Sequence, residues 1–234
     1  MNENTKNQWQ KLDELRRTDP HICGGYYTKN FLKTYRPDFY AEGYDFFPEF
    51  VRVAEKDGEI FCRLEEANVP DEDAPVDSDE CMLETSAGTF VSRDYGEFGG
   101  VLETPGGEIN GNFCDIFEAG GKIYAVDSLS HLGLASTTIY SFDRDCKHHK
   151  VFSAENLDFK ARYATGERAY ILVSGSVSTR SGEKLKSILL EISENGIDAK
   201  TEFDCGFYLV FNMIVKNGKM ILGVDKAVVT LLTA

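Results

Sequence analysis

Residues 211–223 read FNMIVKNGKMILG, in which two short apolar runs flank Asn217-Gly218. An Asn-Gly pair between two such runs is a strong signal for a two-residue β-hairpin turn, because both turn residues need a positive φ. Three more segments share this plan: FVRVAEKDGEIFC at 50–62, FCDIFEAGGKIYA at 113–125 and FKARYATGERAYI at 159–171. Each begins with phenylalanine and has a glycine seven or eight positions later. The sequence therefore predicts a repeated β-hairpin.

The spacing of these hairpins indicates the architecture. The phenylalanines that begin them, Phe50, Phe113, Phe159 and Phe211, are 46 to 63 residues apart. A four-stranded propeller blade takes about 40 to 50 residues. We therefore expect an all-β fold, a β-propeller-like antiparallel meander of four to five hairpin units that need not be complete. The last unit lacks a fourth strand, which the other end of the chain could supply; a curved open sheet or a sandwich is the alternative.

The N-terminal part differs from the rest. Trp9, Leu12 and Leu15 recur at about one helical turn before Asp19-Pro20, which predicts one short amphipathic helix. Residues 26–47 contain nine aromatic side chains, which either cover the end of the sheet core or bind a partner. We expect residues 1–47 to pack on a repeated-hairpin region at 48–234, the two forming one structural domain.

The charge limits the choice of partner. The chain has 39 acidic and 25 basic residues, a net charge of −14, which disfavours binding to nucleic acid. Such a charge either keeps the protein soluble or attracts a basic partner. Residues 65–80 hold eight acidic residues and no basic one, which predicts a solvated connection, and they lack the spacing of an EF-hand calcium site.

The sequence indicates a cytoplasmic protein. No apolar stretch reaches the roughly 18 to 20 residues that span a bilayer, and the polar first residues lack the apolar segment of a signal peptide. The six cysteines are scattered without a C-x-x-C pair, which favours free thiols.

Three groupings could carry chemistry. Cys114, His131 and Asp127 could form a nucleophile with its base and orienting carboxylate; Cys114 nevertheless lies in a predicted strand, where nothing activates its thiol. The run Asp143–His149 holds a thiol and two imidazoles, but the second ligand pair of a zinc site is missing. The third grouping consists of carboxylates that could serve glycoside chemistry: Asp94, Glu97, Asp115 and Asp127.

None of these groupings is a specific signature. Motifs that cradle phosphates, including the G-x-x-x-x-G-K-S/T loop, do not occur. We therefore expect no catalytic residue, no metal and no cofactor.

One segment resembles known proteins. Residues 92–100 read SRDYGEFGG, followed by GNFCD at 111–115. This resembles an S-N-D-H-G-E-W/F-G-G stretch of bacterial proteins, some of which are similar to immunity proteins encoded beside polymorphic or contact-dependent toxins. Arg93 and Tyr95 depart from that pattern. The alternative is structural, with the glycines forming a bulge and Asp94 capping a turn.

The leading hypothesis is a non-enzymatic cytoplasmic binding protein, an immunity protein that neutralises a toxin by occlusion. Its expected partner is a protein, such as a basic toxin domain, rather than nucleic acid or a membrane. The expected partner-binding residues are Tyr35, Phe39, Asp94, Tyr95, Glu97 and Phe98. The alternatives are a propeller-type interaction or ligand-sensing module, and a hydrolase acting on a sugar or small ester.

Overall fold

The fold was analysed in a computed structural model, which describes residues 9–12, 14, 49–66, 79–95, 99–131, 134–179, 182–207, 210–224 and 227–233. This part of the chain is all-β, as predicted, and its strands form five antiparallel sheets. The described residues contain no helix that is long and apolar enough to cross a membrane.

The strands follow one another along the chain almost sheet by sheet. The first sheet contains β1 (Gln10–Lys11), β2 (Glu49–Lys56) and β3 (Glu59–Glu66), in the order β1-β3-β2. The second contains β4 (Asp79–Thr85), β5 (Gly88–Asp94), β6 (Gly100–Thr104) and β7 (Gly107–Asn110). The third contains β8 (Phe113–Ala119), β9 (Lys122–His131), β10 (Leu134–Phe142) and β11 (His148–Glu155). The fourth contains β12 (Asp158–Ala164), β13 (Ala169–Thr179), β14 (Gly182–Ser193) and β15 (Gly196–Phe203), and the fifth β16 (Asn212–Lys216), β17 (Lys219–Val224) and β18 (Ala227–Leu232).

The predicted hairpin repeat is confirmed. The φ angles are 52° and 81° at Asp57-Gly58, and 50° and 70° at Asn217-Gly218, so both pairs have the two positive values of a type I′ turn. The four starting phenylalanines occupy similar places: Phe50, Phe113 and Phe159 lie at the beginning of β2, β8 and β12, and Phe211 immediately precedes β16.

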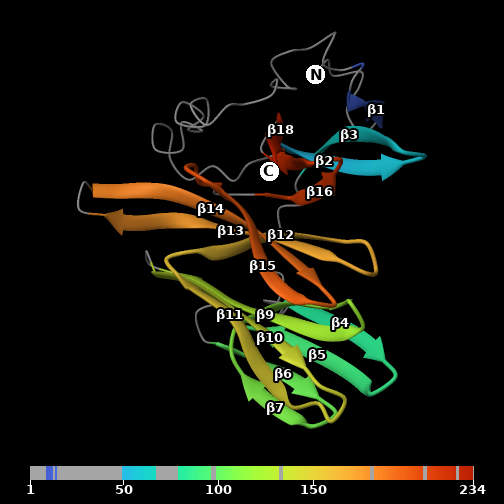
Figure 1. The fold of residues 1–234 in the computed structure, drawn as a ribbon, viewed down its shortest axis with the longest axis vertical. Helices are drawn as coiled ribbons and strands as arrows, with labels where there is room; N and C mark the ends of the chain where they lie inside the picture. The colour runs from blue at the N-terminus through green and yellow to red at the C-terminus, as the bar shows by residue number, and fades with distance from the viewer. Residues whose placement is uncertain are drawn as a thin grey trace.

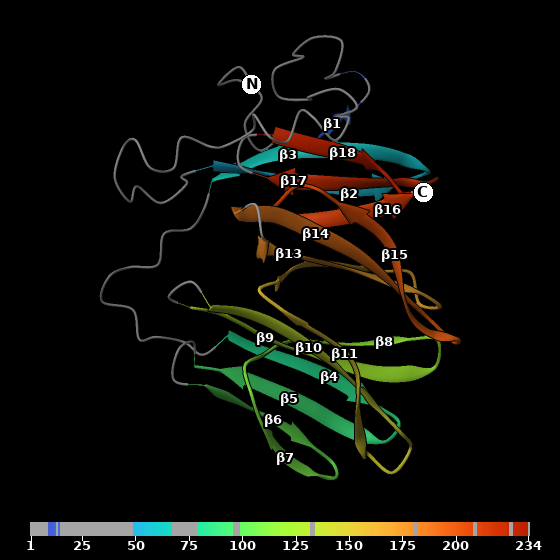
Figure 2. The same ribbon diagram turned by 60° about the vertical axis from the view of Figure 1, so that its left-hand side comes forward.

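The sheets pack face to face in a row (Figures 1 and 2). The β1–β3 sheet packs on the β16–β18 sheet, which packs in turn on the β12–β15 sheet. The β8–β11 sheet follows, and the β4–β7 sheet ends the row. Each junction buries apolar side chains, because each strand alternates its residues between two faces. The first two sheets of the chain thus lie at opposite ends of the row.

The predicted N-terminal helix is not seen. Gln10 and Lys11 instead form β1 and pair with Cys62 and Phe61 of β3, while Leu12 is buried between the first and last sheets. Most of the predicted helix, including Leu15, lies outside the described residues.

The two termini do not share a sheet in the described structure. β1 pairs with β3, and the β16–β18 sheet has three described strands. The expectation that the N-terminal end completes the last unit is therefore not met by β1. The described sheets also do not show a closed ring.

Candidate functional site

The predicted nucleophilic grouping is not assembled. The Cys114 thiol lies 3.6 Å from the carbonyl oxygen of Val126, and a carboxylate oxygen of Asp127 accepts a hydrogen bond from the Asn112 amide at 2.9 Å. His131 ends β9, four residues beyond Asp127, which is about 13 Å along a strand. The imidazole therefore lies too far along β9 to act as a base for the thiol.

The predicted metal loop is a turn closed by its own first residue. A carboxylate oxygen of Asp143 accepts hydrogen bonds from the amides of Asp145 and Lys147, each at 2.9 Å. These hydrogen bonds lower the pKa of Asp143, and the bond from the Lys147 amide has the largest effect. His149 lies 3.6 Å from the other oxygen of that carboxylate, while His148 stacks edge-on against Tyr140. Across the described residues, no three His, Cys, Asp or Glu side chains are grouped as metal ligands would be.

Of the predicted carboxylates, Asp115 has the most developed environment. Arg162 of β12 donates to both oxygens of this buried group, from Nε at 2.6 Å and from Nη2 at 3.2 Å. The guanidinium also lies 4.9 Å from the ring centroid of Phe117. Burial raises the pKa of Asp115, although the charge of Arg162 opposes this shift. The pair links two adjacent sheets, and no second carboxylate takes part in it.

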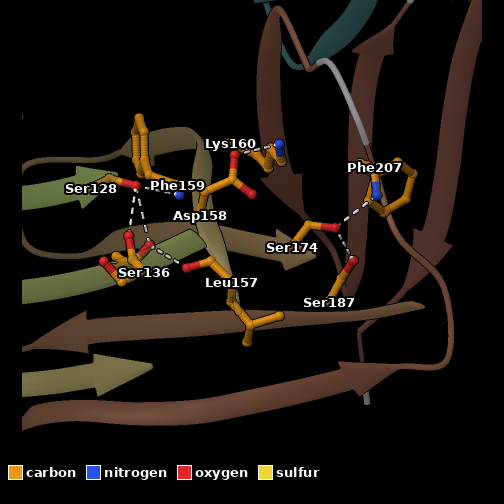
Figure 3. A network of polar contacts seen from close by, with 10 residues as sticks. Ser128, Ser136, Leu157, Asp158, Phe159, Lys160, Ser174, Ser187 and Phe207 are labelled. Carbon is orange, nitrogen blue, oxygen red and sulfur yellow. Dashed lines mark hydrogen bonds and ion pairs between the residues drawn. The ribbon is translucent and has the colours of Figure 1, made fainter. Parts of the chain in front are cut away.

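Buried hydroxyl groups form a polar network between sheets (Figure 3). At the junction of the β8–β11 and β12–β15 sheets, Ser128 accepts a hydrogen bond from the amide of Phe159 at 2.9 Å. Thr137, on the neighbouring strand β10, donates to the carbonyl of Leu157 at 2.9 Å. The two hydroxyl oxygens are 3.3 Å apart.

The next junction repeats this arrangement. Ser174 accepts from the amide of Phe207 at 2.7 Å, and Ser187 donates to the carbonyl of Cys205 at 2.7 Å. The two serine oxygens are 2.8 Å apart. Each pair of hydroxyls holds the segment that leads into the next sheet, so these groups connect the sheets rather than form a nucleophilic centre.

The SRDYGEFGG segment at 92–100 connects β5 to β6. Asp94 is the last residue of β5, and the amide of Tyr95 donates to the carbonyl of Gly99 at 2.8 Å, closing the connection. The Tyr95 side chain is 49% exposed. Of the other predicted partner-binding residues, Tyr35, Phe39, Glu97 and Phe98 lie outside the described residues.

Beside Tyr95 lies the solvent-facing side of the β4–β7 sheet, here named the β4–β7 outer face. Leu83, Phe90 and Leu102 point to the opposite side and pack on the β8–β11 sheet. Strict alternation and the strand register place the following residues on the outer face: Glu80, Met82 and Glu84 of β4, Val91 and Arg93 of β5, Val101 and Glu103 of β6, and Glu108 and Asn110 of β7.

The centre of this face is apolar and its surroundings are acidic. Met82 is 61% exposed and lies opposite Val91, while Val101 lies opposite Arg93 on the next strand. Four carboxylates and one guanidinium share the face. Arg93 pairs with Glu103 and lies 3.8 Å from Glu80.

Two of the four carboxylates, Glu84 and Glu108, form no ion pair with any described residue. An apolar centre within a charged rim is the usual arrangement of a protein-binding surface.

Sequence reasoning missed most of this face. The resemblance drew attention to residues 92–100, on β5 and β6, but the exposed residues of β4 were not singled out. Glu80 was counted as part of the acidic connection at 65–80, whereas it belongs to β4. The alternation of Glu80, Met82 and Glu84 with Cys81 and Leu83 was the signal that could have revealed a half-exposed strand.

The chain matches no known protein-family model, and no curated protein is significantly similar to it.

Proposed function

We propose that the protein is a non-enzymatic, cytoplasmic binding protein that holds a basic protein partner on the β4–β7 outer face. The observation that carries this proposal is an apolar centre, made of the exposed Met82 and the half-buried Val91 and Val101, within a rim of four carboxylates. Such a rim accelerates association with a positively charged surface, and the apolar centre supplies lasting affinity.

The local resemblance suggests the biological setting. Residues 92–100, which resemble immunity proteins of toxin systems, include Arg93 of this face and the adjacent Tyr95. A basic toxin domain is a partner of the required charge. Occlusion of that domain needs a tight interface but no proton transfer, metal or cofactor, so it agrees with the separate placement of Cys114 and His131.

The row of sheets supports a finer description of the fold. We infer that the five sheets are propeller-like units in an incomplete array. Four of the five sheets contain a hairpin with one of the repeated phenylalanines at or immediately before the start of its first strand, and the β4–β7 sheet is the exception. Two successive junctions use the same paired hydroxyls. An array that ends at the β4–β7 sheet leaves the outer face of that sheet available to a partner.

The test compares two exposed apolar residues on different sheets. Met82 on β4 and Leu185 on β14 are 61% and 47% exposed. Met82→Arg places a positive charge at the centre of the proposed interface, whereas Leu185→Arg makes the same change elsewhere. We expect the first variant to weaken binding of a basic partner by about 30-fold or more, as for a hot-spot residue, and the second to bind normally.

The assay proceeds from capture to function. Proteins captured from the native host by the wild-type chain are identified by mass spectrometry, and each basic candidate is measured against both variants. A candidate toxin is then co-expressed with each variant in a growth assay. The proposal fails if the captured proteins are not basic, or if Met82→Arg and Leu185→Arg bind and protect equally well.

A further inference from the structure

A second candidate site lies at the other end of the row of sheets, where β1, β3 and β16 meet (Figure 1). A cavity of about 240 Å³ opens between the β2–β3 hairpin and the β16–β17 hairpin. Its lining comes from the three strands of the β16–β18 sheet, from the start of β3, from the turns of both hairpins and from Lys11 and Leu12 at the end of β1. These residues are Lys11, Leu12, Gly58, Glu59, Ile60, Lys216, Asn217, Lys219, Ile221 and Thr230.

The charge of this lining is opposite to that of the whole chain. Three lysines and one glutamate line the cavity, in a protein whose net charge is −14. Lys11 Nζ lies 2.5 Å from the Glu59 carboxylate. Lys216 donates to the carbonyl of Gly58 at 2.9 Å and also pairs with Glu55, outside the lining. Three lysines and two carboxylates therefore gather where two hairpin turns approach each other, which leaves a small excess of positive charge.

The lining also offers apolar surface. Leu12 and Ile221 are almost fully buried, and Ile60 packs against the same cluster. The two turns add backbone, because Gly58 and Asn217 are turn residues of type I′ hairpins.

We propose that this cavity binds a small phosphate-bearing molecule. The ammonium groups of lysine are established ligands of phosphate, and the three lysines outnumber the two carboxylates, Glu59 and Glu55, that pair with Lys11 and Lys216. The apolar part of the lining would contact a small organic group attached to the phosphate. A volume of about 240 Å³ lies below the roughly 300 to 1,000 Å³ of pockets for drug-sized ligands, so the ligand is small.

The test uses phenyl phosphate and inorganic phosphate as probes, with binding to the full chain measured by titration calorimetry. Lys11→Met removes one positive charge from the lining and should weaken binding of both probes by about two- to fivefold, the effect of an exposed charge pair. Glu59→Gln removes the opposing carboxylate and should strengthen binding by a similar factor. Lys122→Met makes the same charge change at an exposed residue of β9, away from the cavity, and should leave binding unchanged.

The outcomes separate the possible sources of binding. Tighter binding of phenyl phosphate than of inorganic phosphate supports an organic phosphate ester, and equal binding supports a site for phosphate itself. Absence of binding for both probes overturns the proposal. Equal weakening by Lys11→Met and Lys122→Met also overturns it, because that result would reflect the overall charge of the chain rather than the cavity. The β4–β7 outer face lies at the opposite end of the row, so these results do not depend on the proposed partner.

Discussion

Replacing Ser174 with alanine tests how the sheets are held together. The Ser174 hydroxyl accepts a hydrogen bond from the buried amide of Phe207 at 2.7 Å. This bond links the β12–β15 sheet to the segment that leads into the β16–β18 sheet. Alanine removes this acceptor and leaves the amide without a partner in a dry environment. Leaving such a group unsatisfied costs about 1 to 3 kcal/mol, so we expect a loss of about 2 kcal/mol in the free energy of unfolding.

The assay is urea unfolding followed by circular dichroism, where the midpoint should fall without a change in slope. A loss of about 2 kcal/mol corresponds to about 4 to 8 °C in melting temperature for a chain of this size. Ser176→Ala is the matched control, because the Ser176 hydroxyl donates to Glu183 at an exposed site. Its effect should remain within about 0.5 kcal/mol.

The neighbouring hydroxyl makes the test stricter. Ser187 lies 2.8 Å from Ser174 and donates to the carbonyl of Cys205, so the two serines belong to one network. The effects of Ser174→Ala and Ser187→Ala should therefore not add in the double variant. A loss for Ser174→Ala no larger than that for Ser176→Ala would refute the assignment of this hydroxyl to the junction.

Three further predictions concern the turns, a buried acid and a buried thiol. A Cβ at Gly120 would lie 2.5 Å from the backbone of the β14–β15 turn, whereas one at Gly121 would meet nothing within 4 Å, and both residues have positive φ. Gly120→Ala should therefore lower the thermal midpoint more than Gly121→Ala does. Equal losses would contradict the close approach. Because burial raises the pKa of Asp115, the folded state holds the carboxyl proton more tightly than the unfolded state. The contribution of this group to the free energy of unfolding therefore falls as pH rises through and above the ordinary carboxyl range. Urea unfolding at a series of pH values should show a shallower fall for Asp115→Asn than for the wild type, and parallel profiles would contradict this. Burial raises the pKa of Cys205 to about 12, so its thiol should react slowly with iodoacetamide near neutral pH. Mass spectrometry should find Cys205 labelled far more slowly than the partly exposed Cys146. Equal labelling rates would contradict the burial of Cys205.

The sequence was most informative where structure is local. Asp57-Gly58 and Asn217-Gly218 set their own turns, because two residues and the sign of φ suffice for a type I′ hairpin. The repeated phenylalanines marked the hairpins of four of the five sheets, whereas the β4–β7 sheet contains none of them. Near Trp9, Gln10 and Lys11 pair with β3, which is about 50 residues away along the chain, and no local pattern indicates that pairing.

Contacts between sheets could not be predicted in the same way. The bond from the Phe159 amide to Ser128 joins residues 31 positions apart, and no local pattern marks a serine as an acceptor for a distant amide. The candidate site has a similar limit. The glycine-rich stretch pointed to β5 and β6, but which of their faces is exposed depends on the packing of Phe90 and Leu102 on the next sheet.

The position of the β4–β7 sheet has a consequence for how the molecule opens. In the described structure its buried side chains pack on a single neighbouring sheet, whereas the β12–β15 sheet is covered on both faces. In a linear array, cooperativity is passed between nearest neighbours, so a terminal unit can unfold while the interior persists. Backbone amides of this terminal sheet should therefore exchange with deuterium before those of the interior. A partner bound to its outer face would slow that exchange and extend the cooperative unit by one layer.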